Sequence, residues 1–198
     1  MLPMGGLELS SSTIQGVIGQ GVGFNGTSEW LEIPPPATEL TFARDYSISA
    51  WVRLSHTPSQ SHTSVVGRRF STGYEDSYDL GIYNTKAYFA YAPGYPPMVS
   101  NVTVSPGTWV HMTGVKKGPK ATLYVNGVEA VSLEGVPEVI VMDDNHVTIG
   151  GQYNYSEVTQ HFPGSIDEVR LESVARSAEW ILLAYETQKP GATAVVVQ

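Results

Sequence analysis

Cysteine is absent from this chain of 198 residues. Its absence excludes disulfide bonds, thiolate nucleophiles and cysteine-ligated zinc, because each of these needs a cysteine sulfur. It leaves the cellular compartment open, since many exported bacterial proteins also lack the residue.

Basic residues are scarce. Lysine and arginine number 11 against 19 aspartates and glutamates, which gives a formal net charge of −8 at pH 7. Phosphate binding requires clustered basic side chains, and the only adjacent basic pairs are Arg68-Arg69 and Lys116-Lys117. We therefore expect no nucleic-acid partner.

Long hydrophobic runs are also missing. No apolar stretch approaches the ~20 residues that span a bilayer, so we expect no membrane insertion. Residues 1–6 have neither the basic start nor the apolar core of a signal peptide, and we expect the chain to be a module of a larger protein. The length favours one domain over residues 1–198, with its core at about residues 20–188 and linker-like ends.

What the chain does have is alternation of apolar and polar residues. Ile48, Ala50, Val52 and Leu54 mark one face of a strand, and similar runs occur at 77–83, 86–91, 108–115, 122–125, 128–132 and 147–150. Asn126-Gly127 between two such runs predicts a tight hairpin, because both central positions of a type I′ turn need positive φ. Many short strands at this spacing indicate an all-β fold, an antiparallel β-sandwich or jelly roll.

One short C-terminal helix is expected. Ser177 can cap a segment over 179–185, with Glu179 in its first turn. Trp180, Leu183 and Ala184 have helical spacing and are predicted to form the docked stripe.

Asp167 interrupts an apolar strand pattern. In a regular strand Asp167, Val169 and Leu171 point to the same face. A carboxylate on an apolar face needs a cation, a metal or several N–H donors, and Arg176 or backbone N–H groups are candidate partners beside a metal.

Six blocks follow one another along the chain, at residues 23–34, 46–53, 109–114, 121–127, 147–151 and 162–170. Together they resemble the laminin-G-like domains of the concanavalin A-like jelly-roll family, in its bacterial branch, over about residues 20–188. The resemblance implies two curved antiparallel sheets. It also implies a role outside the cell or in the bacterial cell envelope, usually in binding glycans or proteins.

The family often holds a structural Ca²⁺ near the first and last blocks. The matching ligands here are Asn25 and Asp167, with the carbonyl groups around Gly26 and Gly164 as helpers, which is suitable chemistry for calcium. Asn25 stands where the family commonly has Asp, and this should weaken the site because the amide carries no charge.

Catalysis is not expected. The sequence has no His-Glu-x-x-His pair, Gly-x-Ser-x-Gly elbow or phosphate loop. Glu168 and Glu172 lie roughly 13 Å apart in an unbulged strand, which exceeds the carboxylate separation of retaining and inverting glycosidases. We therefore predict a surface charge ladder there and no enzyme.

Tyrosine is the strongest binding signal, because its ring stacks on a sugar and its hydroxyl reaches the sugar rim. The candidate ligand residues are Tyr83, Tyr91, Tyr95, Tyr153 and Tyr155, with Arg68 and Arg69 as contacts to a carboxylate or sulfate. Two function classes stay open: a module that recognises a polysaccharide or other glycan through tyrosine-rich loops or the concave sheet, and an adhesion or structural module that binds cell-surface proteins and has no sugar site.

Overall fold

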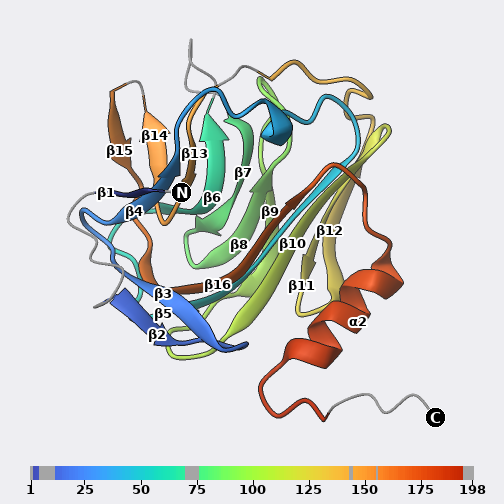
Figure 1. The fold of residues 1–198 in the computed structure, drawn as a ribbon. Coiled ribbons are helices and arrows are strands. Elements are labelled where there is room, and N and C mark those ends of the chain that lie inside the picture. The colour runs from blue at the N-terminus through green and yellow to red at the C-terminus, as the bar shows by residue number, and fades with distance from the viewer. Residues whose placement is uncertain (1, 5–11, 70–75, 143–144, 155, 194–198) are drawn as a thin grey trace.

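The computed structural model describes residues 2–4, 12–69, 76–142, 145–154 and 156–193. Two seven-stranded antiparallel sheets pack face to face (Figure 1). Sheet A has the order β1 (Leu2–Met4), β4 (Trp30–Ile33), β13 (Val147–Ile149), β6 (His62–Arg69), β7 (Asp76–Tyr83), β8 (Lys86–Ala90) and β9 (Met98–Thr103). Sheet B has the order β12 (Val128–Glu134), β11 (Lys120–Val125), β10 (Val110–Lys117), β5 (Tyr46–Leu54), β16 (Pro163–Glu172), β3 (Gln20–Asn25) and β2 (Thr13–Gln15).

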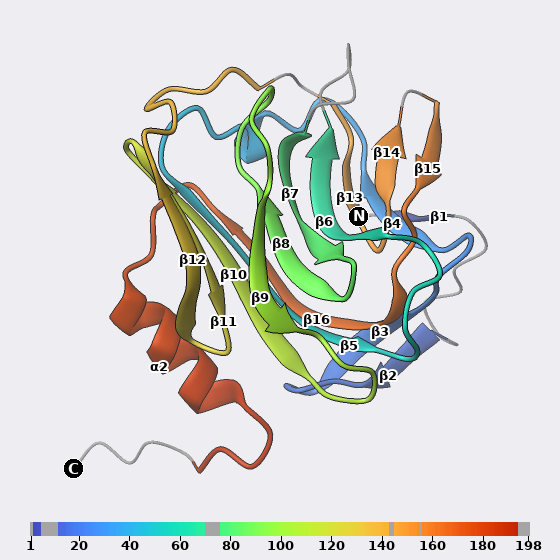
Figure 2. The same cartoon turned by 180° about the vertical axis from the view of Figure 1, so that it is seen from behind.

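Three small elements complete the fold. The β14–β15 hairpin, formed by β14 (Gln152–Asn154) and β15 (Glu157–Thr159), follows β13, and a 3₁₀ turn, η1, covers Thr38–Leu40. Helix α2 (Ala178–Gln188) lies outside sheet B, beside β11 and β12, in both views (Figures 1 and 2). Among the described residues, no helix has the length and apolar character needed to cross a membrane.

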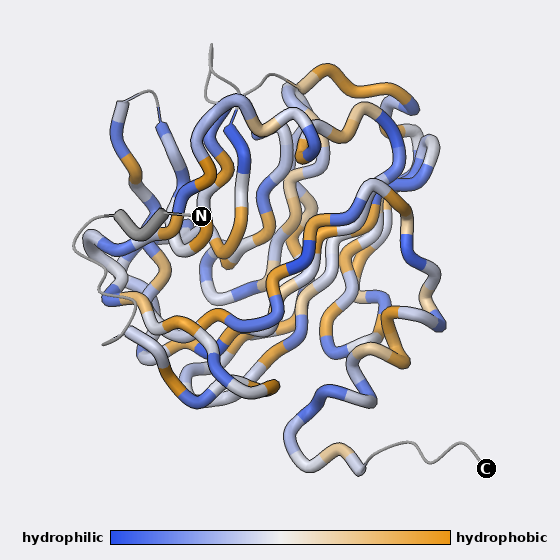
Figure 3. Tube along the Cα trace, viewed as in Figure 1, coloured by the Kyte–Doolittle hydropathy of each residue, from blue (hydrophilic) through white to orange (hydrophobic). Residues whose placement is uncertain are grey.

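The core fills the space between the two sheets. Ile48, Ala50, Val52 and Leu54 of β5 all point into it, as the alternation predicts. Apolar and polar residues alternate along the strands of both sheets (Figure 3). The predicted sandwich is therefore confirmed. The Asn126-Gly127 turn is confirmed as well, with φ of 51° and 79° at its two residues.

The helix forms where the sequence predicts it, but its docked face differs. The Ser177 side chain accepts a hydrogen bond from the Trp180 N–H, which caps the helix. The residues buried against sheet B are Ile181 and Ala184, whereas Leu183 is 57% exposed. The prediction of Leu183 in the docked stripe is wrong, because the turn of the helix directs Ile181 toward Val115 and Tyr124 of sheet B.

Strand β16 contains a bulge that changes the side of Asp167. Asp167 pairs with Trp51 and Arg170 with Ser49, so β16 uses one residue more than β5 over this stretch. Glu168 takes up the irregularity with a φ of 50°. Val169 and Leu171 therefore pack on the core, while Asp167 points outward with Trp51. The prediction that the three side chains share one face is wrong for this reason.

Candidate functional site

Polar side chains line the outer face of sheet A. Leu31 of β4, Ile149 of β13 and Leu80 of β7 belong to the core, so their neighbours along each strand point outward. The register aligns these neighbours in one row across the sheet: Glu32 opposite Thr148, Thr148 opposite Gly67, and Gly67 opposite Asp79.

Trp30, Glu32, His146 and Tyr153 gather at one end of this row, and we call them the Tyr153 surface. The Glu32 carboxylate lies 2.5 Å from Nδ1 of His146 and accepts a 3.3 Å hydrogen bond from Nε1 of Trp30. The Tyr153 ring stacks on the His146 ring, with centroids 3.9 Å apart and planes at 13°. The side chain of Glu32 is 11% exposed and that of His146 22%. Partly exposed rings thus lie beside a nearly buried carboxylate.

Gln152 holds the β14–β15 hairpin, which carries Tyr153, against sheet A. Its Nε2 donates to Oδ1 of Asp76 at 2.7 Å and to Oδ2 of Asp79 at 2.9 Å, and its Oε1 accepts from Nη1 of Arg69 at 2.8 Å. Gln152 is fully buried. Because neighbouring strand residues point to opposite sides, this anchor turns Tyr153 away from the aspartates and onto His146.

The two aspartates behind Gln152 sit in a low-dielectric environment. Burial, together with the charge of Asp76, raises the pKa of Asp79 well above its ordinary value. Burial also raises the pKa of Asp76 to about 6, against the opposing effect of Arg69. Burial lowers the pKa of His62, which lies 3.7 Å from Asp79, to about 4. Such shifts are common at functional sites and also in buried structural networks.

Asp79 has a dense set of donors. Ser64 Oγ donates to its Oδ1 at 2.6 Å, and the Tyr88 hydroxyl donates to its Oδ2. Gly67 leaves room for this carboxylate, since a Cβ there would lie 2.8 Å from Oδ1 of Asp79. The network therefore depends on the absence of a side chain at position 67.

The predicted tyrosines separate into different environments. Tyr153 joins the surface described above. Tyr83 is exposed at the far end of β7 and packs edge-on against His62. Tyr91 is buried in the core, and its carbonyl accepts from the Tyr46 hydroxyl. Tyr155 lies outside the described residues.

The predicted arginine pair does not form a ligand-binding fork. Arg68 is fully buried and donates to the Ala37 carbonyl and to Thr41 Oγ1. Arg69 is nearly buried and donates to Gln152. Their expected role as exposed contacts to a carboxylate or sulfate is wrong, because strand alternation and burial direct both guanidinium groups to protein acceptors.

Tyr95 lies in a separate apolar groove at the end of the sandwich. The groove has a volume of about 280 Å³ and is lined by Ala92, Pro93, Tyr95, Pro137, Val139, Ile140 and Val141. Tyr95, Val139 and Val141 are 46%, 52% and 74% exposed. This surface offers apolar contact area.

The proposed calcium ligands are not brought together. Asn25 pairs with Pro163 at one end of the β3–β16 ladder, and Asp167 lies four residues further along β16, roughly 13 Å away at the strand rise. The Asn25 side-chain oxygen accepts from the N–H groups of Thr27 and Ser28. The carbonyl groups around Gly26 and Gly164 lie at the Asn25 end of this ladder. A shared Asn25–Asp167 calcium site does not fit this geometry.

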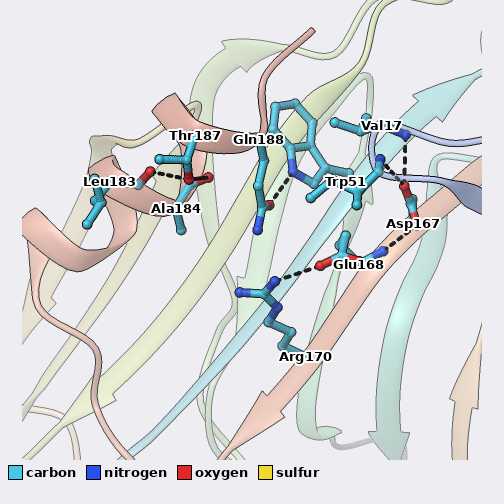
Figure 4. Close-up of polar contacts among 10 residues, drawn as sticks. Val17, Trp51, Asp167, Glu168, Arg170, Leu183, Ala184, Thr187 and Gln188 are labelled. Carbon is cyan, nitrogen blue, oxygen red and sulfur yellow. Dashed lines mark hydrogen bonds and ion pairs between the residues drawn. The ribbon is translucent and has the colours of Figure 1, made fainter. Parts of the chain in front are cut away.

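Asp167 already has three partners (Figure 4). Its Oδ2 accepts from the backbone N–H of Val17 at 2.8 Å and of Ile18 at 3.0 Å, and its Oδ1 accepts from the N–H of Glu168 at 2.8 Å. The N–H groups that point at both oxygens occupy the positions a cation would take. Backbone donors, one of the alternatives that the sequence left open, thus satisfy this carboxylate. Calcium binding by the chain stays a prediction.

Glu168 and Glu172 each form an ion pair with an arginine. Glu168 accepts from Nη2 of Arg170 at 2.6 Å (Figure 4), and Glu172 accepts from Nε of Arg176 at 3.0 Å. Both carboxylates are partly exposed. The predicted charge ladder is present, although the bulge changes its spacing.

The sequence did not indicate a functional role for five residues of this region: Trp30, Glu32, His146, Gln152 and Asp79. One signal was available: Trp30 and Glu32 alternate with Leu31 and Ile33, so a carboxylate and a ring share the outward face of a short strand. The link to His146 and Gln152 was not available, because it depends on how the β14–β15 hairpin folds back.

Comparisons with known proteins agree with the architecture. Domain 4 of the extracellular arabinanase AbnA from Geobacillus stearothermophilus, solved with arabinotriose, has a TM-score of 0.64 and 21% identity over 86% of this chain and 78% of that one. An SAP-like pentraxin from Limulus polyphemus has a TM-score of 0.64 and 13% identity over 84% and 82%. The binding domain of Paraclostridial Mosquitocidal Protein 1 has a TM-score of 0.69 and 12% identity over 88% and 45%.

At these identities the structural likeness shows the fold alone. No curated protein matches the sequence. A family model described as the concanavalin A-like lectin/glucanases superfamily, of laminin G type, matches residues 25–182. The chain therefore belongs to the concanavalin A-like lectin/glucanase superfamily.

Proposed function

We propose that this domain is a non-catalytic carbohydrate-binding module and that the Tyr153 surface is its sugar site. The observation that carries the proposal is the grouping of Trp30 and Tyr153 with the Glu32 carboxylate on the outer face of sheet A. An aromatic ring stacks on the apolar face of a sugar, and a carboxylate accepts hydrogen bonds from its hydroxyl groups.

Pre-organisation supports the proposal. Gln152 fixes the hairpin, His146 supports the Tyr153 ring, and Trp30 and His146 orient Glu32. Binding then requires little ordering of side chains, and this favours affinity. The structural likeness to an arabinanase domain solved with arabinotriose is consistent with a glycan ligand.

The experiment is a glycan array with the wild-type domain, Tyr153→Ala and Tyr95→Ala. Tyr95→Ala is the matched control, because it removes a half-exposed tyrosine from the apolar groove and leaves the Tyr153 surface intact. We expect the wild type and Tyr95→Ala to bind the same glycans, and Tyr153→Ala to lose at least tenfold in affinity. Equal binding by Tyr153→Ala and the wild type would show that the sugar site lies elsewhere on the domain.

The setting of this function is also a proposal. We infer a module of a larger protein that acts outside the cell or in the bacterial cell envelope. The extracellular arabinanase supports this placement, since the likeness there is to one domain of a larger extracellular enzyme. Ca²⁺ binding by the domain belongs to the same proposal.

A second candidate function has its own observation. The exposed apolar groove around Tyr95 and Val141 suits an adhesion or structural module that binds proteins of the cell surface. A domain of this class would bind no glycan on the array, and Tyr95→Ala would weaken its protein contacts while Tyr153→Ala would not.

A further inference from the structure

Carboxyl side chains lie at and behind the Tyr153 surface. Glu32 lies at the surface itself, and Asp76 and Asp79 lie behind Gln152 on the same face of sheet A. The register that pairs Val147 with Arg68 places Arg69 beside His146. The Arg69 guanidinium, however, is nearly buried and directed to Gln152 between the two aspartates.

The exposure of Glu32 and its remaining capacity to accept hydrogen bonds determine how it can contact an incoming ligand. Its side chain is 11% exposed, and each carboxylate oxygen has one protein partner, His146 for Oε1 and Trp30 for Oε2. A carboxylate oxygen has two lone pairs, so each can still accept one more hydrogen bond. A sugar hydroxyl supplies such a donor, whereas a uronate or sulfate group supplies only negative charge.

We propose that the Tyr153 surface selects uncharged glycans and that Glu32 is its specificity-determining residue. This inference rests on the proposed function. A neutral sugar stacks on Tyr153 and donates a hydroxyl to Glu32. A carboxylated or sulfated sugar in the same pose is repelled, because its charge lies close to Glu32 in a partly desolvated site where like charges repel strongly.

The test compares neutral and acidic polysaccharides that share a backbone. The probes are dextran with dextran sulfate, and unsubstituted xylan with glucuronoxylan, together with linear arabinan and the oligosaccharides of the array. Affinity is measured by isothermal titration calorimetry or by affinity gel electrophoresis. The proteins are the wild type, Glu32→Gln, and Glu129→Gln as the control, because Glu129 is an exposed carboxylate on β12 of the other sheet.

We expect the wild type and Glu129→Gln to bind the neutral member of a pair at least tenfold more tightly than the acidic one. Glu32→Gln keeps the shape of the site and should bring the two affinities to within about threefold. Preference of the wild type for the acidic member, or unchanged selectivity in Glu32→Gln, would overturn the inference while the proposed function stands. Binding of no glycan by the wild type would overturn the proposed function itself.

Salt provides a second measurement that needs no variant. Affinity of the wild type for the neutral polysaccharide should not change between 20 and 500 mM NaCl, and any weak binding of the acidic member should strengthen as salt screens the repulsion. Weaker binding of the acidic member at high salt would indicate attraction by a cation and contradict the inference.

Discussion

The Asp167 carboxylate offers a sharp test of how the outer face of sheet B is held together. It accepts three backbone N–H bonds from Val17, Ile18 and Glu168 and is 6% exposed. Replacement by asparagine keeps the size of the side chain and removes its charge. The substitution Asp167→Asn therefore changes the hydrogen bonding with little effect on packing.

The magnitude follows from the number of donors. An asparagine oxygen can keep the N–H groups of Val17 and Ile18, but its NH₂ group then faces the N–H of Glu168. One buried N–H loses its acceptor, at a cost of about 1–3 kcal/mol, and the two remaining bonds lose their charge assistance. We expect the free energy of unfolding to fall by about 2–4 kcal/mol, and Tm by roughly 5–15 °C for a chain of this length.

The assay is urea and thermal unfolding followed by circular dichroism, in EDTA and in 5 mM CaCl₂. Glu168→Gln is the control, because it removes the neighbouring charge and its partly exposed ion pair with Arg170, which contributes about 0–1 kcal/mol. We expect Asp167→Asn to destabilise the domain by the same amount in both buffers.

Two results would contradict this role of Asp167. A loss below about 1 kcal/mol in EDTA would mean that the three hydrogen bonds contribute less than buried bonds to a charged group normally do. Stabilisation of the wild type by Ca²⁺ that disappears in Asp167→Asn would make Asp167 a calcium ligand.

Three further predictions concern other parts of the domain. Burial raises the pKa of Asp76 to about 6, so its protonated form stabilises the folded state, and this stabilisation is lost as the pH rises from about 4 to 6. The free energy of unfolding of Asp76→Asn should therefore rise by about 2 kcal/mol relative to the wild type between pH 4 and pH 7, and a constant difference in urea unfolding would contradict this. Gly67→Ala should lower the free energy of unfolding by about 1–3 kcal/mol, because its Cβ would meet the Asp79 carboxylate. An unchanged Tm would mean that β6 and β7 can accommodate the added methyl group without cost. Ile181→Ala should lower the free energy of unfolding by about 2–5 kcal/mol, and Leu183→Ala should lower it by about 0.5 kcal/mol or less. A larger loss in Leu183→Ala than in Ile181→Ala would indicate that Leu183 is docked, as the sequence predicts.

Local patterns were enough to predict the fold. Alternation along β5 and the Asn126-Gly127 turn depend on neighbours in sequence, and both are confirmed. The Ser177 cap is confirmed for the same reason. These features need no knowledge of distant contacts.

The site depended on contacts that no local pattern contains. The bulge at Glu168 moves Asp167 to the other face, and a regular strand period does not predict a bulge. Arg68 turns toward acceptors in residues 37 and 41, far from it in sequence. The Tyr153 surface requires β4, β13 and the β14–β15 hairpin to meet, so the sequence identified Tyr153 but not its partners.

Tyr153 and its neighbours are proposed to form a sugar site. Its most direct test is titration of the wild-type domain and Tyr153→Ala with the best-bound glycan of the array, after both have been shown to unfold at similar temperatures. We expect saturable binding by the wild type and at least tenfold weaker binding by Tyr153→Ala. Equal affinity of two equally folded proteins, or the absence of any glycan ligand for the wild type, would contradict it.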